Sequence, residues 1–111
     1  MLPAHLEKVR FIQSMIGYWQ CINPILATLS RENCLKEVEV ELYFIRSYNF
    51  QKIAEWLTKL DDQLQDDCYS KVERIHLGLC ELHDGKSPED YAQAMPHAMQ
   101  RGVLQSFKHT R

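Results

Sequence analysis

The chain has 111 residues and a mass of 13.1 kDa, which is room for one compact domain. Its composition, 45% apolar and 25% charged, excludes disordered, collagen-like and low-complexity chains. The formal net charge of −2 argues against a dedicated nucleic-acid-binding protein, because such proteins are normally strongly basic. We therefore expect a single folded domain over residues 1–111, with no nucleic-acid partner.

The start of the chain lacks the pattern of a secretory signal, because Glu7, Lys8 and Arg10 interrupt any apolar stretch. No apolar run approaches the roughly 18 to 20 residues of a membrane span. The four cysteines, at positions 21, 34, 68 and 80, show no paired spacing, and we expect them to be reduced. These observations predict a cytoplasmic protein with no membrane partner.

The first segment carries apolar residues every three or four positions, namely Leu6, Val9, Ile12, Ile16 and Trp19. This spacing predicts a helix that ends near Ile22, because the residue before Pro24 is disfavoured in helical backbone. A short helical piece is expected from Pro24 to Leu29.

Ser30 is the predicted N-cap of the next helix, over residues 31–46. Inside that range, the run from Glu37 to Glu41 alternates glutamate and valine with a period of two, which also permits a strand. We favour the helix, because the sequence shows no second strand of comparable quality. A lone strand would leave its backbone hydrogen bonds unmade.

Asn49 is the predicted N-cap of a helix over residues 50–65, and Asp66-Asp67 suits the start of another over 68–83. Gly85 is the natural end of that helix.

The strongest local signal is Ser87-Pro88 followed by two acids, because it combines an N-cap, a first-turn proline and first-turn carboxylates. It predicts a helix to about residue 107 with a kink at Pro96. The sequence therefore predicts an all-α fold of five to six antiparallel helices, arranged as stacked helical hairpins or a bundle.

Four potential metal ligands lie at spacings of 3, 4 and 3 on the predicted helix 68–83. They are Glu73, His76, Cys80 and His83. This stripe lies beside the apolar face, and ligands on one straight helix cannot close a tetrahedron. We therefore expect no metal, no cofactor and no catalytic site, and the four-residue set is kept as the alternative.

The charges are unevenly distributed along the chain. Residues 32–67 hold nine acids and four bases, whereas residues 91–111 hold three bases and no acid. This asymmetry permits the tail to pack on the acidic middle, or one copy of the chain to contact another.

Two segments suggest a helical repeat. Residues 77–85, with Leu77-Gly78 and a glycine turn, are followed by Asp90-Tyr91-Ala92. This arrangement resembles the unit of Sel1-like and tetratricopeptide repeats. Residues 42–59 resemble the same unit. The resemblance covers residues 35–105 and implies paired antiparallel helices.

Residues 79–85 are also similar to a segment of small tetratricopeptide-like chaperones of type III secretion needle subunits. This second resemblance implies a concave groove that holds an amphipathic helix.

We expect a non-enzymatic protein-binding module, an adaptor or chaperone, that holds a partner's amphipathic helix or peptide in an apolar groove. The expected partner-contacting aromatic residues are Phe11, Tyr18, Tyr43, Tyr48, Trp56 and Tyr91. A homodimer is also expected to be possible, since two faces of the first predicted helix are apolar. The alternatives are a metal-binding bundle protein or enzyme and a small regulatory protein.

Overall fold

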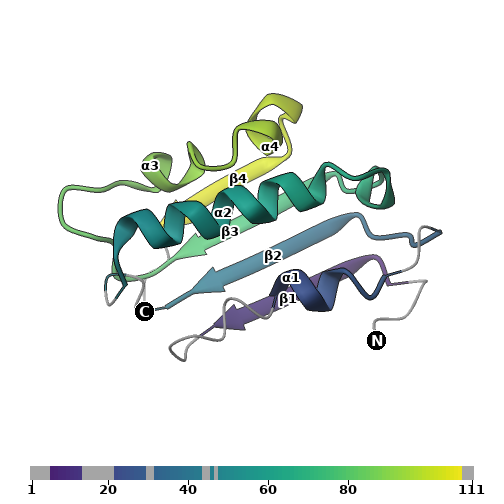
Figure 1. Cartoon of the computed structure of the whole chain (residues 1–111), viewed down its shortest axis with the longest axis horizontal. Coiled ribbons are helices and arrows are strands. Elements are labelled where there is room, and N and C mark those ends of the chain that lie inside the picture. Colours follow the sequence, from purple (N-terminus) through teal and green to yellow (C-terminus); the bar gives the residue numbers. More distant parts are fainter. Residues whose placement is uncertain (1–5, 14–21, 30–31, 44–45, 47, 109–111) are drawn as a thin grey trace.

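The computed structural model describes residues 6–13, 22–29, 32–43, 46 and 48–108. Helices and strands alternate along most of this chain (Figure 1). The elements are β1 (Lys8–Gln13), α1 (Ile22–Leu26), β2 (Glu37–Leu42), α2 (Phe50–Leu64), the 3-10 turn η3 (Asp67–Tyr69), β3 (Arg74–Leu79), α3 (Pro88–Ala92), α4 (Pro96–Arg101) and β4 (Leu104–Lys108).

The four strands form one parallel sheet in the order β1-β2-β3-β4, which is also their order in the chain. Val9, Val38, Ile75 and Leu104 lie side by side across the four strands. The successive strand-to-strand steps are therefore 29, 37 and 29 residues long.

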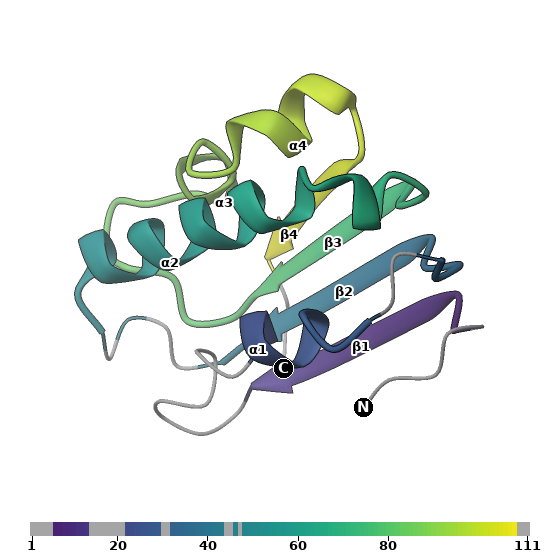
Figure 2. The same ribbon diagram turned by 45° about the vertical axis from the view of Figure 1, so that its right-hand side comes forward.

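All four helices cover the same face of this sheet (Figures 1 and 2). Crossovers between parallel strands are almost always right-handed, so strands added in chain order bring every helix to one side. The described chain is thus a one-sided β/α solenoid, in which each turn packs on its neighbours.

The core lies between the sheet and the helices. In β2 and β3 the valine, isoleucine and leucine side chains that face the helices are buried. The first residue of each strand, Glu37 or Arg74, lies on the other side of the sheet and is at least partly exposed. Leu35 and Val72 are also buried, and each lies three residues before the first buried apolar residue of its strand. Facing them, α2 contributes Ile53, Trp56, Leu57, Leu60 and Leu64.

The predicted all-α fold is wrong, because four segments expected in helices are strands. The run Glu37–Leu42 has partners on both sides, β1 and β3, which receive its backbone hydrogen bonds. Its apolar neighbours imitate a helix, since Leu35, Val38 and Leu42 are three and four residues apart. The three-residue spacing between Leu35 and Val38 arises because Leu35 packs into the core from the segment just before the strand.

The resemblance to Sel1-like and tetratricopeptide repeats, and to the needle-subunit chaperones, is likewise contradicted. Leu77-Gly78 belongs to β3 and pairs with β2, so it cannot be part of a helical hairpin. The parallel sheet replaces the stacked helix pairs that those repeats require.

The start signals near Asn49 and Ser87 are confirmed. The Asn49 side chain accepts a hydrogen bond from the Gln51 backbone N–H, and α2 follows almost over the predicted range. Ser87 and Asp90 form a capping box at the start of α3. Pro96 does not kink a long helix; it begins the separate helix α4, which ends at Gly102 in a left-handed conformation.

Asp61, on the buried side of α2, fixes the start of α4. Its two carboxylate oxygens accept hydrogen bonds from the backbone N–H groups of His97 and Ala98, both at 2.9 Å. The side chain is almost completely buried. Its neighbour Asp62 is exposed and lies 3.7 Å from the His97 ring. Asp61 therefore connects two helices that are far apart in the sequence.

We expect Asp61→Ala to lower the free energy of unfolding by about 1–3 kcal/mol, because one buried and one partly buried N–H group lose their acceptor. Asp62→Ala is the matched control and should change it by less than about 1 kcal/mol, because exposed ion pairs contribute little. Urea unfolding followed by circular dichroism measures both variants. Equal losses for the two aspartates would contradict this role.

Candidate functional site

The face of the sheet that the helices leave uncovered carries two rows of polar side chains. Across the strands, the first row is Lys8, Glu37 and Arg74, and the second row is Arg10, Glu39, His76 and Gln105. We call these seven residues the open face. Parallel sheets are normally covered on both sides, so a polar, uncovered face is unusual.

Glu37 lies at the centre of the first row. Its carboxylate is 3.5 Å from the Lys8 ammonium, 3.3 Å from the Arg74 guanidinium and 2.8 Å from His76 Nε2. The hydrogen bond from His76, together with the two nearby cations, holds the pKa of Glu37 below its ordinary value. Both flanking strands are thereby attached to β2 through one carboxylate.

Arg10 connects the second row to Glu41 further along β2. Its guanidinium lies 3.2 Å from the Glu39 carboxylate and 2.6 Å from that of Glu41, which also accepts a hydrogen bond from the Tyr43 hydroxyl. The hydrogen bond to Glu41 and the charge of the two acids raise the pKa of Arg10. Glu41 is nearly fully buried although it lies on the uncovered side, so it depends on this pairing.

Beyond the charged rows, Gly78 of β3 leaves space for an aromatic ring. A Cβ atom at Gly78 would lie 3.2 Å from the Phe107 ring and 3.4 Å from the Glu41 side chain. The glycine therefore permits Phe107 of β4 to lie against the sheet beside Glu41. Phe107 remains partly exposed and forms an apolar border to the open face.

The six aromatic residues predicted to contact a partner lie in different environments. Phe11, Trp56 and Tyr91 are buried in the hydrophobic core, and Tyr43 and Tyr48 are half-buried. Tyr18 lies outside the described residues. Their role in partner binding stays a prediction, and none of them belongs to the open face.

The four potential ligands on residues 73–83 do not share a helix face, because most of that range is β3. His76 lies on the open face against Glu37, and Cys80 is buried. His83 packs elsewhere: its Nε2 is 2.6 Å from the Tyr48 carbonyl oxygen, and its Nδ1 is 2.7 Å from the Tyr91 hydroxyl. Both ring nitrogens of His83 are therefore already hydrogen-bonded.

One other group of potential ligands is close together within the described part of the chain, Asp61, Asp62 and His97. Both oxygens of Asp61 already accept backbone hydrogen bonds at the start of α4. This group is therefore accounted for by helix capping.

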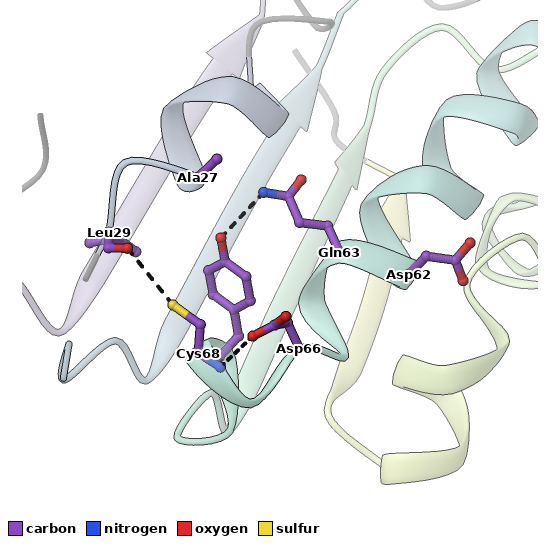
Figure 3. Close-up of a pocket in the computed structure, with 7 residues that line it drawn as sticks. Ala27, Leu29, Asp62, Gln63, Asp66 and Cys68 are labelled. Atoms are coloured by element: carbon purple, nitrogen blue, oxygen red, sulfur yellow. Dashed lines mark hydrogen bonds between the residues drawn. The ribbon is translucent and has the colours of Figure 1, made fainter. Parts of the chain in front are cut away.

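On the helical side, a surface hollow of about 360 Å³ lies between the end of α1 and η3 (Figure 3). Several of its polar groups are hydrogen-bonded within the protein. Gln63 contacts the Tyr69 hydroxyl at 3.2 Å, and the Cys68 backbone N–H donates to Asp66. The Asp62 carboxylate points away from the Cys68 thiol. The hollow presents no converging set of groups for a ligand, and the open face is the stronger candidate.

Comparison with protein families, with characterised proteins and with solved structures finds no match to this chain. The open face is therefore interpreted from its own geometry.

The open face is not among the predicted sites, although the sequence contains one signal for it. The alternation of glutamate and valine from Glu37 marks a strand with one polar and one apolar side. The same alternation is present in Arg74–Leu79, where isoleucine and leucines alternate with arginine, histidine and glycine. Read together, these runs predict neighbouring strands.

Acidification should weaken the ion pairs that Glu37 forms in the first row of the open face and thereby lower the stability of the fold. Because the folded-state pKa of Glu37 lies below its ordinary value of 4.5, its pairing stabilises the fold above that pH and is lost as the pH falls through the lower, folded-state value. Glu37→Gln should therefore flatten the fall in stability below pH 4.5. Urea unfolding midpoints at a series of acidic pH values test this, and unchanged pH dependence in the variant would refute it.

The pairing of Arg10 with buried Glu41 predicts that two single variants differ in how much they destabilise the fold. Arg10→Ala should lower the urea midpoint more than Lys8→Ala, because it removes the guanidinium from a buried carboxylate. Removal of the Lys8 side chain, by contrast, leaves Glu37 with two other basic neighbours. Adding Glu41→Gln to Arg10→Ala should recover part of the loss, since the buried charge is then gone. The reverse order of the two single variants would contradict this assignment.

Proposed function

We propose that the chain is a non-enzymatic protein-binding module that holds a partner on the open face of its parallel sheet. The observation that carries the proposal is a parallel sheet whose described helices all cover one face, while the other face is lined by an ordered ion-pair network. Solenoids built from stacked repeats use such extended surfaces to bind other molecules.

The repeat pattern supports this proposal. Leucine-rich repeats follow the pattern Leu-x-x-Leu-x-Leu-x-x-Asn/Cys-x-Leu, with the strand inside it. The sequence Val72-Glu-Arg-Ile-His-Leu-Gly-Leu-Cys80-Glu-Leu82 fits it throughout when valine and isoleucine replace leucine. Leu35, with Val38 and Val40, repeats the first half. We infer a divergent leucine-rich-repeat type of solenoid, in which the open face is the inner surface.

The chemistry of the open face supports binding over catalysis. Strand β2 presents three glutamates on this side of the sheet, Glu37, Glu39 and Glu41. Each of them pairs with a basic side chain of an adjacent strand. Their carboxylates are therefore fixed in ion pairs and are not aimed into a cavity where a reaction could take place. This arrangement orders a surface.

A cytoplasmic location is part of this proposal. None of Cys34, Cys68 and Cys80 forms a disulfide within the described residues, as is usual in reducing compartments. No helix among those residues is long and apolar enough to cross a membrane.

Site-specific photo-crosslinking in the native host tests the proposed surface. Gln105 is exposed on β4 in the second row, whereas Glu55 is exposed on α2 on the opposite side. With p-benzoylphenylalanine at position 105, we expect a discrete protein adduct that is absent when the probe is at position 55. Adducts of equal yield from both positions, or none from position 105, would count against the proposal. An adduct between two copies of the chain would identify the partner as itself.

A further inference from the structure

We propose that the open face recognises an acidic, extended segment of a partner protein. This inference rests on the proposed function and adds the chemistry of the partner. It follows from the arrangement of the charges on the open face, because the basic side chains there are far more exposed than the carboxylates with which they pair.

The basic side chains of the network lie outermost. The side chains of Lys8, Arg10 and Arg74 are 54%, 50% and 58% exposed. The carboxylates beneath them are far less accessible, since Glu37 and Glu39 are 16% and 17% exposed. A molecule that approaches the sheet therefore meets ammonium and guanidinium groups first.

The spacing of these cations fits carboxylates on an extended chain. Lys8 and Arg10 are two residues apart on β1, or about 6.6 Å at the rise of a strand. Side chains on one side of an extended segment recur at the same interval. Glutamate or aspartate at alternate positions of a partner could therefore pair with both, while Arg74, two strands away, provides a third contact.

The open face is bordered by an apolar residue, which makes the site asymmetric. Phe107 is 39% exposed and lies against Gly78, beyond the charged rows. An aromatic ring is an efficient interface anchor. We therefore expect the partner segment to carry at least one apolar side chain next to its acidic residues.

A protein partner fits these observations better than a nucleic acid. The open face presents three exposed cations, which match a few carboxylates of a short segment, and the net charge of the chain is −2. Nucleic-acid affinity depends on neutralising many phosphates with an excess of bases.

Nuclear magnetic resonance titration of the full chain tests the proposal with defined probes. The first probe is a short capped peptide that alternates glutamate and serine and contains one leucine. The second is the same peptide with lysine in place of glutamate, and the third is single-stranded DNA. We expect the acidic peptide alone to shift the backbone amides of the strands while those of α2 stay unchanged. Added salt should weaken the effect.

Paired variants locate the contact. Lys8→Gln with Arg74→Gln should weaken binding of the acidic peptide by about 3- to 10-fold, because exposed ion pairs each contribute modestly. Lys52→Gln with Lys59→Gln removes the same charge from exposed positions on α2 and should leave the affinity unchanged. Phe107→Ala should weaken binding without altering its salt dependence. Circular dichroism confirms that each variant is folded.

Three results would overturn the inference: no strand shifts with the acidic peptide, equal binding of the lysine peptide or of DNA, or equal losses in the two double variants. A position-105 crosslink to a partner segment without acidic residues would also overturn it, while leaving the proposed function intact. Absence of any position-specific crosslink, by contrast, would remove the proposed function itself.

Discussion

The parallel pairing of β2 with β1 on one side and β3 on the other determines both surfaces of the sheet. On the helical side it aligns Val9, Val38 and Ile75 into one apolar row beneath α1 and α2. On the other side it places the glutamates of β2 between the basic residues of its neighbours. A shift of one residue in either pairing would send charged side chains into the core, so the register is strongly specified.

The charged network explains how a parallel sheet tolerates a face that none of the described helices covers. Neighbouring strands present opposite charges to each other, and such cross-strand pairs are individually modest but add up along the ladder. Long lysine and arginine side chains can also shield apolar surface with their aliphatic stems while the charged end stays in water. The open face is thus shielded by its own side chains, in place of a second layer of helices.

The sequence was sufficient to predict α2, because its apolar stripe and the Asn49 cap are local features. It did not suffice for β2, whose stability depends on partners 29 and 37 residues away. The alternation from Glu37 permits a strand, but its partners β1 and β3 carry apolar residues at helix-like spacings, so the sequence alone favours a helix. The open face is hidden for the same reason, since Lys8 and Arg74 become neighbours of Glu37 only in the sheet.

The internal pairing of the cations also determines how a partner would compete for them. A carboxylate that arrives at Arg74 must share this guanidinium with Glu37, which lies 3.3 Å away. Binding would then exchange one ion pair for another. The cations are held in place beforehand, which lowers the entropic cost of association, but each new contact weakens an existing one. Such a surface suits a reversible complex that forms and dissociates rapidly.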